Sequence, residues 1–214
     1  MNGKCYEVLK NYKYMKDDIL HLVPIYCEET IIGYLRPITA DFMIAMPNIV
    51  STLSRWRRDN PMAGTGSFEV TDARTQNWVE KFVLKNEKRI IFLIQDLEFR
   101  YIGHIGLAEI DTEQNSADID AVLRGERGIS KGIMTYALQA IINWCKIKLG
   151  IRNIFLDVFS DNPHAIKFYE KNNFIEVKRI ALEQICYENE IKWEINETMN
   201  PNEAERCYIR MELV

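Results

Sequence analysis

The sequence predicts an α+β fold whose sheet is mixed and mostly antiparallel, with one strand–helix–strand unit inside it. Three apolar runs follow one another between residues 89 and 123 with short polar links, which favours antiparallel pairing. A long helical pattern and then a further β-forming run come after them. The chain has 214 residues, 47% of them hydrophobic and 27% charged, so it can bury the core that such a fold needs.

The N-terminal part gives the weakest pattern. Residues 1–30 are expected to form an N-terminal extension, a short helical or hairpin addition, and residues 31–214 a single domain. An apolar run over 31–35 is followed by Arg36 and Pro37, and a proline there is typical of the end of a strand. A short helix is expected over residues 40–46.

Turn-forming residues dominate the next stretch. Residues 56–61 read Trp-Arg-Arg-Asp-Asn-Pro and residues 64–67 read Gly-Thr-Gly-Ser, which predicts a loop. Thr71 precedes a helical segment. The three strands that follow are expected over residues 89–95, 101–110 and 117–123.

The clearest helix follows these strands. Its apolar residues recur at spacings of three and four: Met134, Ala137, Leu138, Ile141, Ile142, Cys145 and Leu149. Gly150 stands where a glycine commonly ends a helix. A strand is expected over residues 154–159, and a strand, helix and strand of these lengths imply a right-handed crossover between parallel strands.

A second helix is expected to begin at Asn162 and Pro163. Asn is a good N-cap residue, and Pro suits the first helical position. Asn173 tolerates the left-handed conformation that ends such a helix. The remaining expected elements are a strand from residue 174 onwards, an acidic and turn-rich segment over 188–203, and a final strand over 208–213.

Charge and cysteine content exclude several classes of protein. A net charge of −4 and a pI of about 5.5 argue against a nucleic-acid partner. The five cysteines form no CxxC pair and no Cys/His cluster, so we expect no metal site and reduced thiols in a cytoplasmic protein. Without a run of about 18 apolar residues, no membrane partner is expected. The oligomeric state stays open, a homodimer being one alternative.

Residues 160–174, SDNPHAIKFYEKNNF, resemble a pattern of the GNAT acyltransferase superfamily: Asn, two spacers, Ala, two spacers, Phe-Tyr, then a helix end and Phe. The strand at 117–123, the glycine-bearing loop and the long helix resemble the coenzyme-A-binding unit of that family. Residues 35–39, LRPIT, resemble the subgroup that includes ribosomal-protein N-terminal acetyltransferases. The resemblance covers roughly residues 31–213. It implies the GNAT fold, with a sheet that splays between the strands flanking the long helix.

One motif departs from the family pattern. The pyrophosphate loop of the family reads Gln or Arg, two spacers, Gly, one spacer, then Gly or Ala. In the best alignment Gly132 matches, but Ile129 replaces Gln or Arg and Met134 replaces Gly or Ala. This departure keeps open a GNAT-fold binding module without turnover, since fold does not fix function.

The resemblance implies acetyl-coenzyme A as cofactor and assigns residues to it. A helix N-terminus offers unpaired amides to a pyrophosphate, here over Ser130, Lys131, Gly132, Ile133, Met134 and Thr135. The backbone of Val122, Leu123 and Arg124 would pair with pantetheine amides and stabilise an oxyanion. Asn162 would hydrogen-bond the pantetheine, and Tyr169 would protonate the leaving thiolate.

An amine acceptor must lose a proton, and several residues are candidates for the base. Asp118 resembles the acidic residue that the family carries at this strand position. Asp120 lies two residues on, so it shares a strand face with Asp118, and paired acids can raise a pKa. A polar, solvent-facing side of the strand explains both acids equally well. Asp118 is the expected base, with Asp120 and a water as its helpers. His104 and Glu109 on the neighbouring strand are further candidates, and His104 ranks below Asp118 because a lone histidine on a strand is more often structural.

The acceptor is expected to bind before the core strands, at Trp56, Arg57 and Arg58. Arginines suit phosphate, and a tryptophan ring can stack on a base or sugar. A solvated arginine pair beside a core tryptophan is the alternative explanation. The expected function is N-acetyl transfer to the primary amine of a small molecule, such as an amino-sugar nucleotide. A protein N-terminal acetyltransferase is the second enzyme hypothesis.

Overall fold

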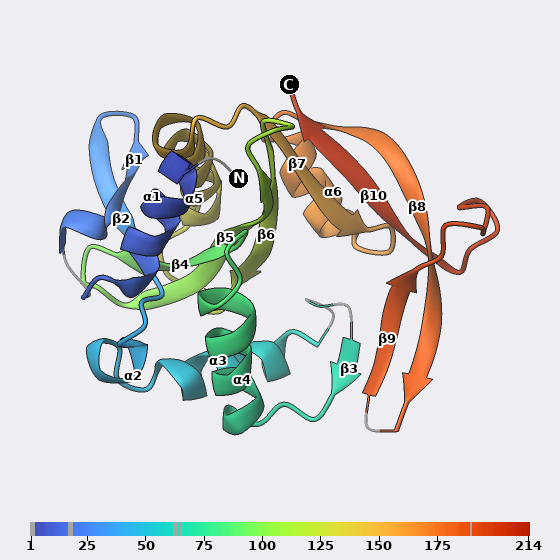
Figure 1. Cartoon of the computed structure of the whole chain (residues 1–214), viewed down its shortest axis with the longest axis horizontal. Helices are drawn as coiled ribbons and strands as arrows, with labels where there is room; N and C mark the ends of the chain where they lie inside the picture. The colour runs from blue at the N-terminus through green and yellow to red at the C-terminus, as the bar shows by residue number, and fades with distance from the viewer. Residues whose placement is uncertain (1–2, 17–18, 62–63, 65, 189) are drawn as a thin grey trace. The chain divides into compact units, whose positions relative to one another are not determined.

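The computed structural model describes residues 3–16, 19–61, 64, 66–188 and 190–214. The chain forms two compact units (Figure 1). Unit 1 consists of Met1–Asp59 and Val70–Arg152, and unit 2 of Asn60–Glu69 and Asn153–Val214. The expected division at residue 30 stays a prediction, and so does the parallel crossover around the long helix, which would join the two units.

The sheet of unit 1 is antiparallel between all neighbouring strands. Its order is β1 (Val23–Cys27), β2 (Thr30–Pro37), β4 (Ile90–Asp96), β5 (Tyr101–Asp111) and β6 (Ser116–Arg124). The strands predicted from residue 31 onwards are confirmed to within two residues. Within the expected N-terminal extension, β1 pairs with β2 and so extends the sheet.

Helices pack on both faces of this sheet. Alternate residues of β4 point to opposite faces, so Phe92 meets the rings of Tyr12 and Trp144 on one side, while Ile91 and Leu93 join a core cluster with Trp56 on the other. The first side carries α1 (Gly3–Tyr14) and α5 (Ile133–Trp144), which continues as the π-helical η3 (Cys145–Leu149). The second carries α2 (Phe42–Ala45), α3 (Ile49–Asp59), α4 (Asp72–Trp78) and the π-helical η2 (Val79–Leu84). A short 3-10 turn, η1 (Ile19–His21), lies between α1 and β1.

The loop predicted over residues 56–61 is wrong for most of its length. Helix α3 extends to Asp59 and is followed by Asn60 and Pro61. Ile49, Leu53 and Trp56 recur at helical spacing and are buried, which outweighs the turn-forming residues beside them. The proline marks only the end of the helix.

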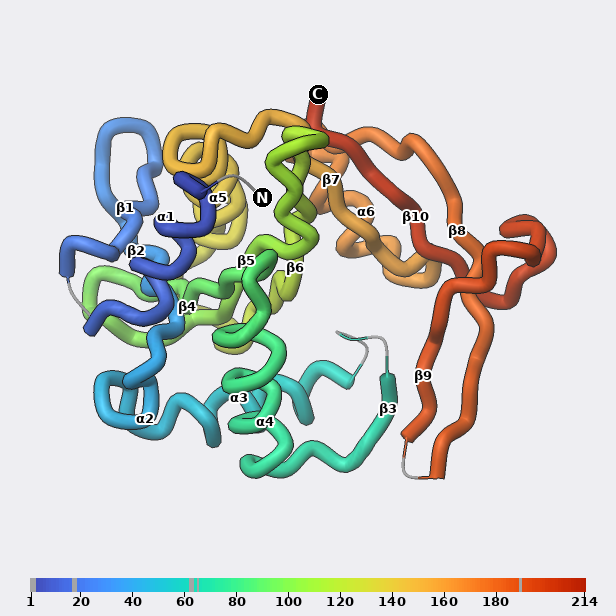
Figure 2. Tube along the Cα trace, viewed as in Figure 1, coloured from blue at the N-terminus to red at the C-terminus, as the bar shows by residue number. Residues whose placement is uncertain are grey.

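The sheet of unit 2 is also antiparallel between all neighbouring strands. Its order is β7 (Asn153–Phe159), β10 (Arg206–Leu213), β8 (Phe174–Tyr187), β9 (Glu190–Ile195) and β3 (Gly66–Phe68). Helix α6 (Pro163–Glu170) connects β7 to β8. Figure 2 shows β8 and β9 as a long hairpin. The turn-rich segment predicted over 188–203 is therefore wrong at β9, where apolar residues alternate with charged ones.

The N-cap predicted at Asn162 is confirmed, and Thr71, which precedes a predicted helix, caps α4 in the same way, whereas Asp41 at the start of α2 makes no side-chain cap. The side chain of Thr71 accepts a hydrogen bond from the backbone N–H of Arg74, and that of Asn162 accepts one from Ala165. Gly150 has φ 74° and Asn173 has φ 65°, as expected of left-handed residues after helices. The α+β class and the mostly antiparallel pairing are confirmed as well.

Candidate functional site

Strand β6 contains a β-bulge close to its C-terminal end. Leu123 pairs with His104 and Asp120 with Gly106, so two residues of β6, Ala121 and Val122, lie opposite a single residue of β5. Ala121 has φ 49°, in the left-handed region. The bulge therefore falls immediately before the backbone of Leu123 and Arg124, which the family resemblance assigns to the pantetheine.

The loop between β6 and α5 is held by a side chain. Arg124 donates from Nε to the carbonyl oxygen of Glu126 at 2.9 Å and from Nη2 to that of Ile129. Gly128 and Gly132 have φ 82° and 84°, which favours glycine at both positions. A Cβ atom at Gly128 would meet no atom within 4 Å, so space beside the loop is open.

The start of α5 carries the residues expected at a pyrophosphate. Gly132 is its N-cap, and no side chain caps the helix. The N–H groups of Ile133 and Thr135 bond within the turn, to Ser130 and Gly132 at 3.2 and 3.0 Å. Lys131 is exposed beside them. An uncapped helix start after a glycine-bearing loop fits an anionic ligand.

Trp56 packs behind this loop and offers no ring face to a ligand. It is 0% exposed, and its Nε1 donates to Oε1 of Glu126 at 2.8 Å. Arg55 also pairs with Glu126. Of the other two residues expected at the acceptor, Arg57 is half-buried, and burial lowers its pKa. Arg58 is exposed and donates to the carbonyl oxygen of Val70 at 3.3 Å.

Three of the candidate bases, His104, Asp118 and Asp120, share one face of the sheet. His104 pairs directly with Leu93 and Leu123, which belong to the core cluster beneath α3 and η2. Asp120 pairs with Gly106 and Asp118 with Ala108, at positions that alternate in step with His104. Glu109 lies in a second irregularity of β5, with φ 47°, and is exposed.

Only some of these groups are close enough to interact strongly. Oδ2 of Asp120 lies 2.5 Å from Nη2 of Arg89, whose guanidinium stands 5.7 Å from the ring centre of Trp78. Nδ1 of His104 lies 2.5 Å from the carbonyl oxygen of Ala121. Burial lowers the pKa of His104 to about 4, against the opposing effects of that hydrogen bond and of the Asp120 charge.

Unit 2 holds the other residues assigned to the cofactor. Oδ1 of Asn162 is used in the helix cap, at 3.1 Å from the Ala165 nitrogen, which leaves the Nδ2 group as its donor for a ligand. Tyr169 is 8% exposed, and its ring packs edge-on against those of Phe168 and Phe174.

Sequence reasoning missed Arg206. This arginine is 7% exposed, its guanidinium stands 3.7 Å from the ring centre of Phe159, and its Nε lies 3.1 Å from Oδ1 of Asp161. It therefore supports the turn that begins α6, next to Asn162. The pairing joins residues 45 apart, and no local pattern in the sequence marks it.

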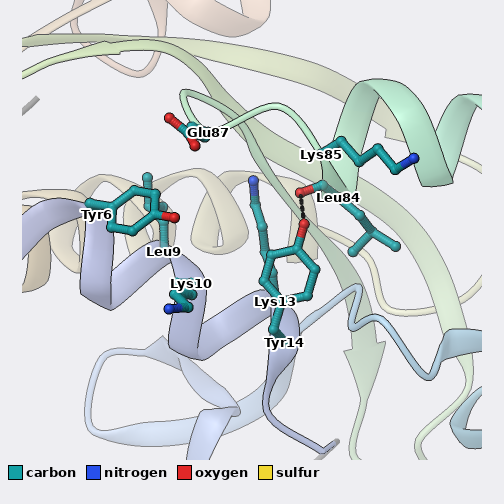
Figure 3. Close-up of a pocket in the computed structure, with 8 residues that line it drawn as sticks. All are labelled: Tyr6, Leu9, Lys10, Lys13, Tyr14, Leu84, Lys85 and Glu87. Atoms are coloured by element: carbon teal, nitrogen blue, oxygen red, sulfur yellow. Dashed lines mark hydrogen bonds between the residues drawn. The ribbon is translucent and has the colours of Figure 1, made fainter.

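A small pocket of about 70 Å³ lies elsewhere in unit 1, between α1 and the end of η2 (Figure 3). Lys13 lines it and is 2% exposed, with Nζ 2.5 Å from the carbonyl oxygen of Asn86. Burial lowers the pKa of Lys13 to about 8. Tyr14 closes one side through a 2.9 Å hydrogen bond to the carbonyl of Leu84. The residues of this pocket include none of those assigned above to the cofactor or the base.

Among the described residues, no three or more His, Cys, Asp or Glu side chains gather as metal ligands would. None of the helices in the described ranges is long and apolar enough to cross a membrane.

Known proteins resemble this chain in sequence and in fold. The sequence profile of the Acetyltransferase (GNAT) domain matches residues 34–175. Spermidine N(1)-acetyltransferase of Vibrio cholerae is 27% identical over 85 residues, which are 40% of this chain and 49% of that protein. The chain thus spans about half the length of this curated relative.

Solved structures share the fold. The crystal structure of spermidine N-acetyltransferase from Vibrio cholerae in complex with CoA and spermine matches with a TM-score of 0.56 and 21% identity, over 84% of this chain and 93% of that chain. A dodecameric structure of spermidine N-acetyltransferase from the same organism matches with a TM-score of 0.55 and 16% identity, over 77% of this chain and 87% of that one. These likenesses confirm the expected fold.

Proposed function

Because the chain belongs to the Acetyltransferase (GNAT) domain family, we propose that it transfers an acetyl group from acetyl-coenzyme A to a primary amine of a small molecule. The observation that carries the proposal is the bulge at Ala121 and Val122, followed directly by the glycine-bearing loop and the uncapped start of α5. A bulge takes an extra residue out of the regular strand ladder, and this is the place where the family resemblance would have an acyl donor bind.

Acetyl-coenzyme A supplies the activated acetyl group as a thioester. The start of α5, from Ser130 to Thr135, would hold the pyrophosphate through helix-terminal amides, with the exposed Lys131 adding positive charge. The backbone of residues 122–124 would bind the pantetheine and stabilise the oxyanion that develops on the acetyl carbonyl. From unit 2, Asn162 would donate to a pantetheine carbonyl.

The chemistry needs two proton transfers. The amine nitrogen forms a bond to the acetyl carbon while the bond from that carbon to sulfur breaks. A base takes one proton from the amine, and Tyr169 would give a proton to the leaving thiolate. An acyl-enzyme would need a nucleophilic side chain beside the base, and none is evident next to the described candidate bases. We therefore propose a direct transfer from the thioester to the amine.

For the acceptor, we favour a polyamine-like cation over an amino-sugar nucleotide. Strand β6 carries the carboxylate of Asp118, and a carboxylate attracts a cationic amine. Trp56 is buried, so the stacking surface expected for a nucleotide is replaced by a core contact. The relatives that act on spermidine point to the same class.

The experiment is a screen of purified protein with acetyl-coenzyme A against spermidine, spermine, amino-sugar nucleotides and N-terminal peptides. Acetylated polyamine, identified by mass spectrometry, is the expected product. Acetylation of only the peptides would favour the protein N-terminal acetyltransferase instead. Calorimetry that detects no acetyl-coenzyme A binding would overturn the proposal. No disulfide joins the five cysteines, all of them in the described part of the chain, which fits a cytoplasmic location, and self-association, for example as a homodimer, is part of the same proposal.

A further inference from the structure

We propose that His104 is the general base of this enzyme and accepts the amine proton at Nε2. The inference rests on the proposed acetyl transfer and assigns one of its two proton transfers. Three features of His104 distinguish it from Asp118 and Asp120 as a candidate base. They are the hydrogen bond of its ring, the residues around the ring and its position beside the bulge.

The tautomer of His104 is set by its backbone partner. Nδ1 lies 2.5 Å from the carbonyl oxygen of Ala121, and a carbonyl oxygen can only accept a hydrogen bond. Nδ1 therefore carries the proton and donates it, which leaves a lone pair on Nε2. A fixed donor on one ring nitrogen is how histidine bases are commonly oriented.

Two tryptophans lie beside the His104 ring. The ring centres of Trp56 and Trp78 lie 6.2 and 6.4 Å from that of His104, on α3 and α4. His104 stays half-buried between them, whereas Trp56 is fully buried. The imidazole thus has an apolar surround that fixes its orientation, while the residue as a whole is half-buried.

The position of His104 matches the expected site of reaction. Its hydrogen-bond partner, Ala121, is the first residue of the β6 bulge, and Val122 is the next. The family resemblance assigns the backbone from Val122 to Arg124 to the acyl-pantetheine. His104 is the side chain of β5 that is tied to this backbone, so it can reach an amine that attacks there.

The acids are less suited to the role. Asp120 is held by Arg89 at 2.5 Å, so taking a proton would cost it an ion pair. Asp118 lies one pleat further from the bulge, a separation of about 7 Å along the strand. Its cross-strand partner is Ala108, two positions beyond Gly106.

The charged groups facing His104 also favour this assignment. Asp120 stabilises the imidazolium that forms when the base takes a proton, while Arg89 opposes it. The aromatic rings of α3 and α4 that lie near the His104 ring belong to the two uncharged tryptophans. Burial lowers the pKa of His104, so its imidazole is neutral at the pH of an assay and keeps a lone pair on Nε2.

The test is His104→Asn, because an asparagine amide can keep the donor to the Ala121 carbonyl but has no basic nitrogen. The expected result is a fall in kcat of about 10²–10⁴-fold with an unchanged Kd for acetyl-coenzyme A and an unchanged Tm. In His104→Ala, added 4-methylimidazole is expected to restore part of the rate, which a structural role would not allow. His21→Asn, the same substitution on η1, is the matched control and keeps the wild-type rate.

A kcat of His104→Asn within threefold of wild type, under conditions where chemistry limits turnover, would overturn the assignment. A second measurement does not depend on turnover: nitrogen-15 NMR of wild-type protein is expected to show a neutral His104 with its proton on Nδ1 at pH 6. A proton on Nε2 would also overturn it. If wild type acetylates no amine while NMR shows the Nδ1 tautomer, the proposed function fails and the geometry of His104 stands.

Discussion

Gly125 packs its backbone against the indole ring of Trp56 so closely that a Cβ atom added there would lie 2.1 Å from two ring carbons. The ring is part of the core, and its Nε1 is bonded to Glu126, the residue after Gly125. The glycine thus sets the path of the loop that leaves the β6 bulge. Glycine is needed at position 125 because the backbone lies so close to the Trp56 ring, not because the residue has a positive φ angle.

Replacing this glycine is expected to disturb the core and the loop together. Gly125→Ala should lower the free energy of unfolding by about 1–3 kcal/mol, the usual range for overpacking, and weaken acetyl-coenzyme A binding. Urea denaturation and calorimetry measure the two effects. Gly128→Asn is the matched control, because its Cβ meets open space and Asn tolerates a positive φ. If both variants unfold with the same free energy, the Trp56 ring can shift to make room for the added Cβ atom, and the prediction is wrong.

Arg124 is expected to support the cofactor loop through its side chain as well as its backbone. Its bonds to the carbonyls of Glu126 and Ile129 fold the loop back on the end of β6. Arg124→Gln cannot span both carbonyls, so the Kd for acetyl-coenzyme A should rise about tenfold, which corresponds to roughly 1.4 kcal/mol. The Tm should change little, because the loop is at the surface. A wild-type Kd in calorimetry would show that the loop is ordered without this side chain.

The sequence predicts most of the fold because its signals are local. Strands, helix caps and the left-handed residues after helices depend on near neighbours, and these predictions hold at Thr71, Gly150, Asn162 and Asn173. The errors also have a local origin. Turn-forming residues led to a loop being predicted over the end of α3. Acidic residues led to a turn-rich segment being predicted where β9 alternates apolar and charged residues.

The candidate site is less accessible from sequence because it depends on register. The bulge at Ala121 arises from the register between β5 and β6, and the local sequence ADIDAVLR does not predict it. The ion pair of Asp120 with Arg89 and the tryptophans around His104 join residues from separate elements. Pattern reasoning therefore nominated His104 and the two acids and preferred Asp118, because these contacts between separate elements are not visible in the sequence.

Asn162 is expected to have two separable roles. Its Oδ1 caps α6, and its Nδ2 would bind the pantetheine. Asn162→Asp keeps a good cap, so the Tm should stay near wild type while the Kd for acetyl-coenzyme A rises. Asn162→Ala loses the cap too, and its unfolding free energy should fall by about 1 kcal/mol. If calorimetry shows a higher Kd only for the Ala variant, the residue acts through the helix alone.

Tyr169→Phe is expected to separate packing from proton transfer. The phenylalanine ring keeps the edge-on contacts with Phe168 and Phe174. If the hydroxyl protonates the thiolate, kcat should fall about 10²–10⁴-fold with little change in the Kd for acetyl-coenzyme A. Tyr208→Phe, on a ring stacked against Phe159 in the same unit, is the control. An unchanged single-turnover rate would remove Tyr169 from the mechanism.

Lys13 is expected to make the free energy of unfolding change with pH in the alkaline range. Its pKa is lowered from 10.5 to about 8 by burial in the pocket of Figure 3, so between these values the unfolded chain holds a proton that the folded protein has lost. The contribution of Lys13 to the free energy of unfolding therefore rises as pH increases from about 8 to 10.5. At about 1.4 kcal/mol per pKa unit, the rise is about 3 kcal/mol.

Lys13→Met tests this, because methionine fills a similar apolar volume without the charge. At pH 7 the variant should be more stable than wild type by about 1–2 kcal/mol, since the lost bond to the Asn86 carbonyl offsets part of the gain. That advantage should disappear by pH 10. Cys145, whose pKa burial raises to about 12, contributes a slope of opposite sign in both proteins, so the difference between them isolates Lys13. Urea denaturation from pH 7 to 10 measures the difference, with Lys10→Met as an exposed control. Parallel curves would mean that the Lys13 ammonium is well solvated in the pocket.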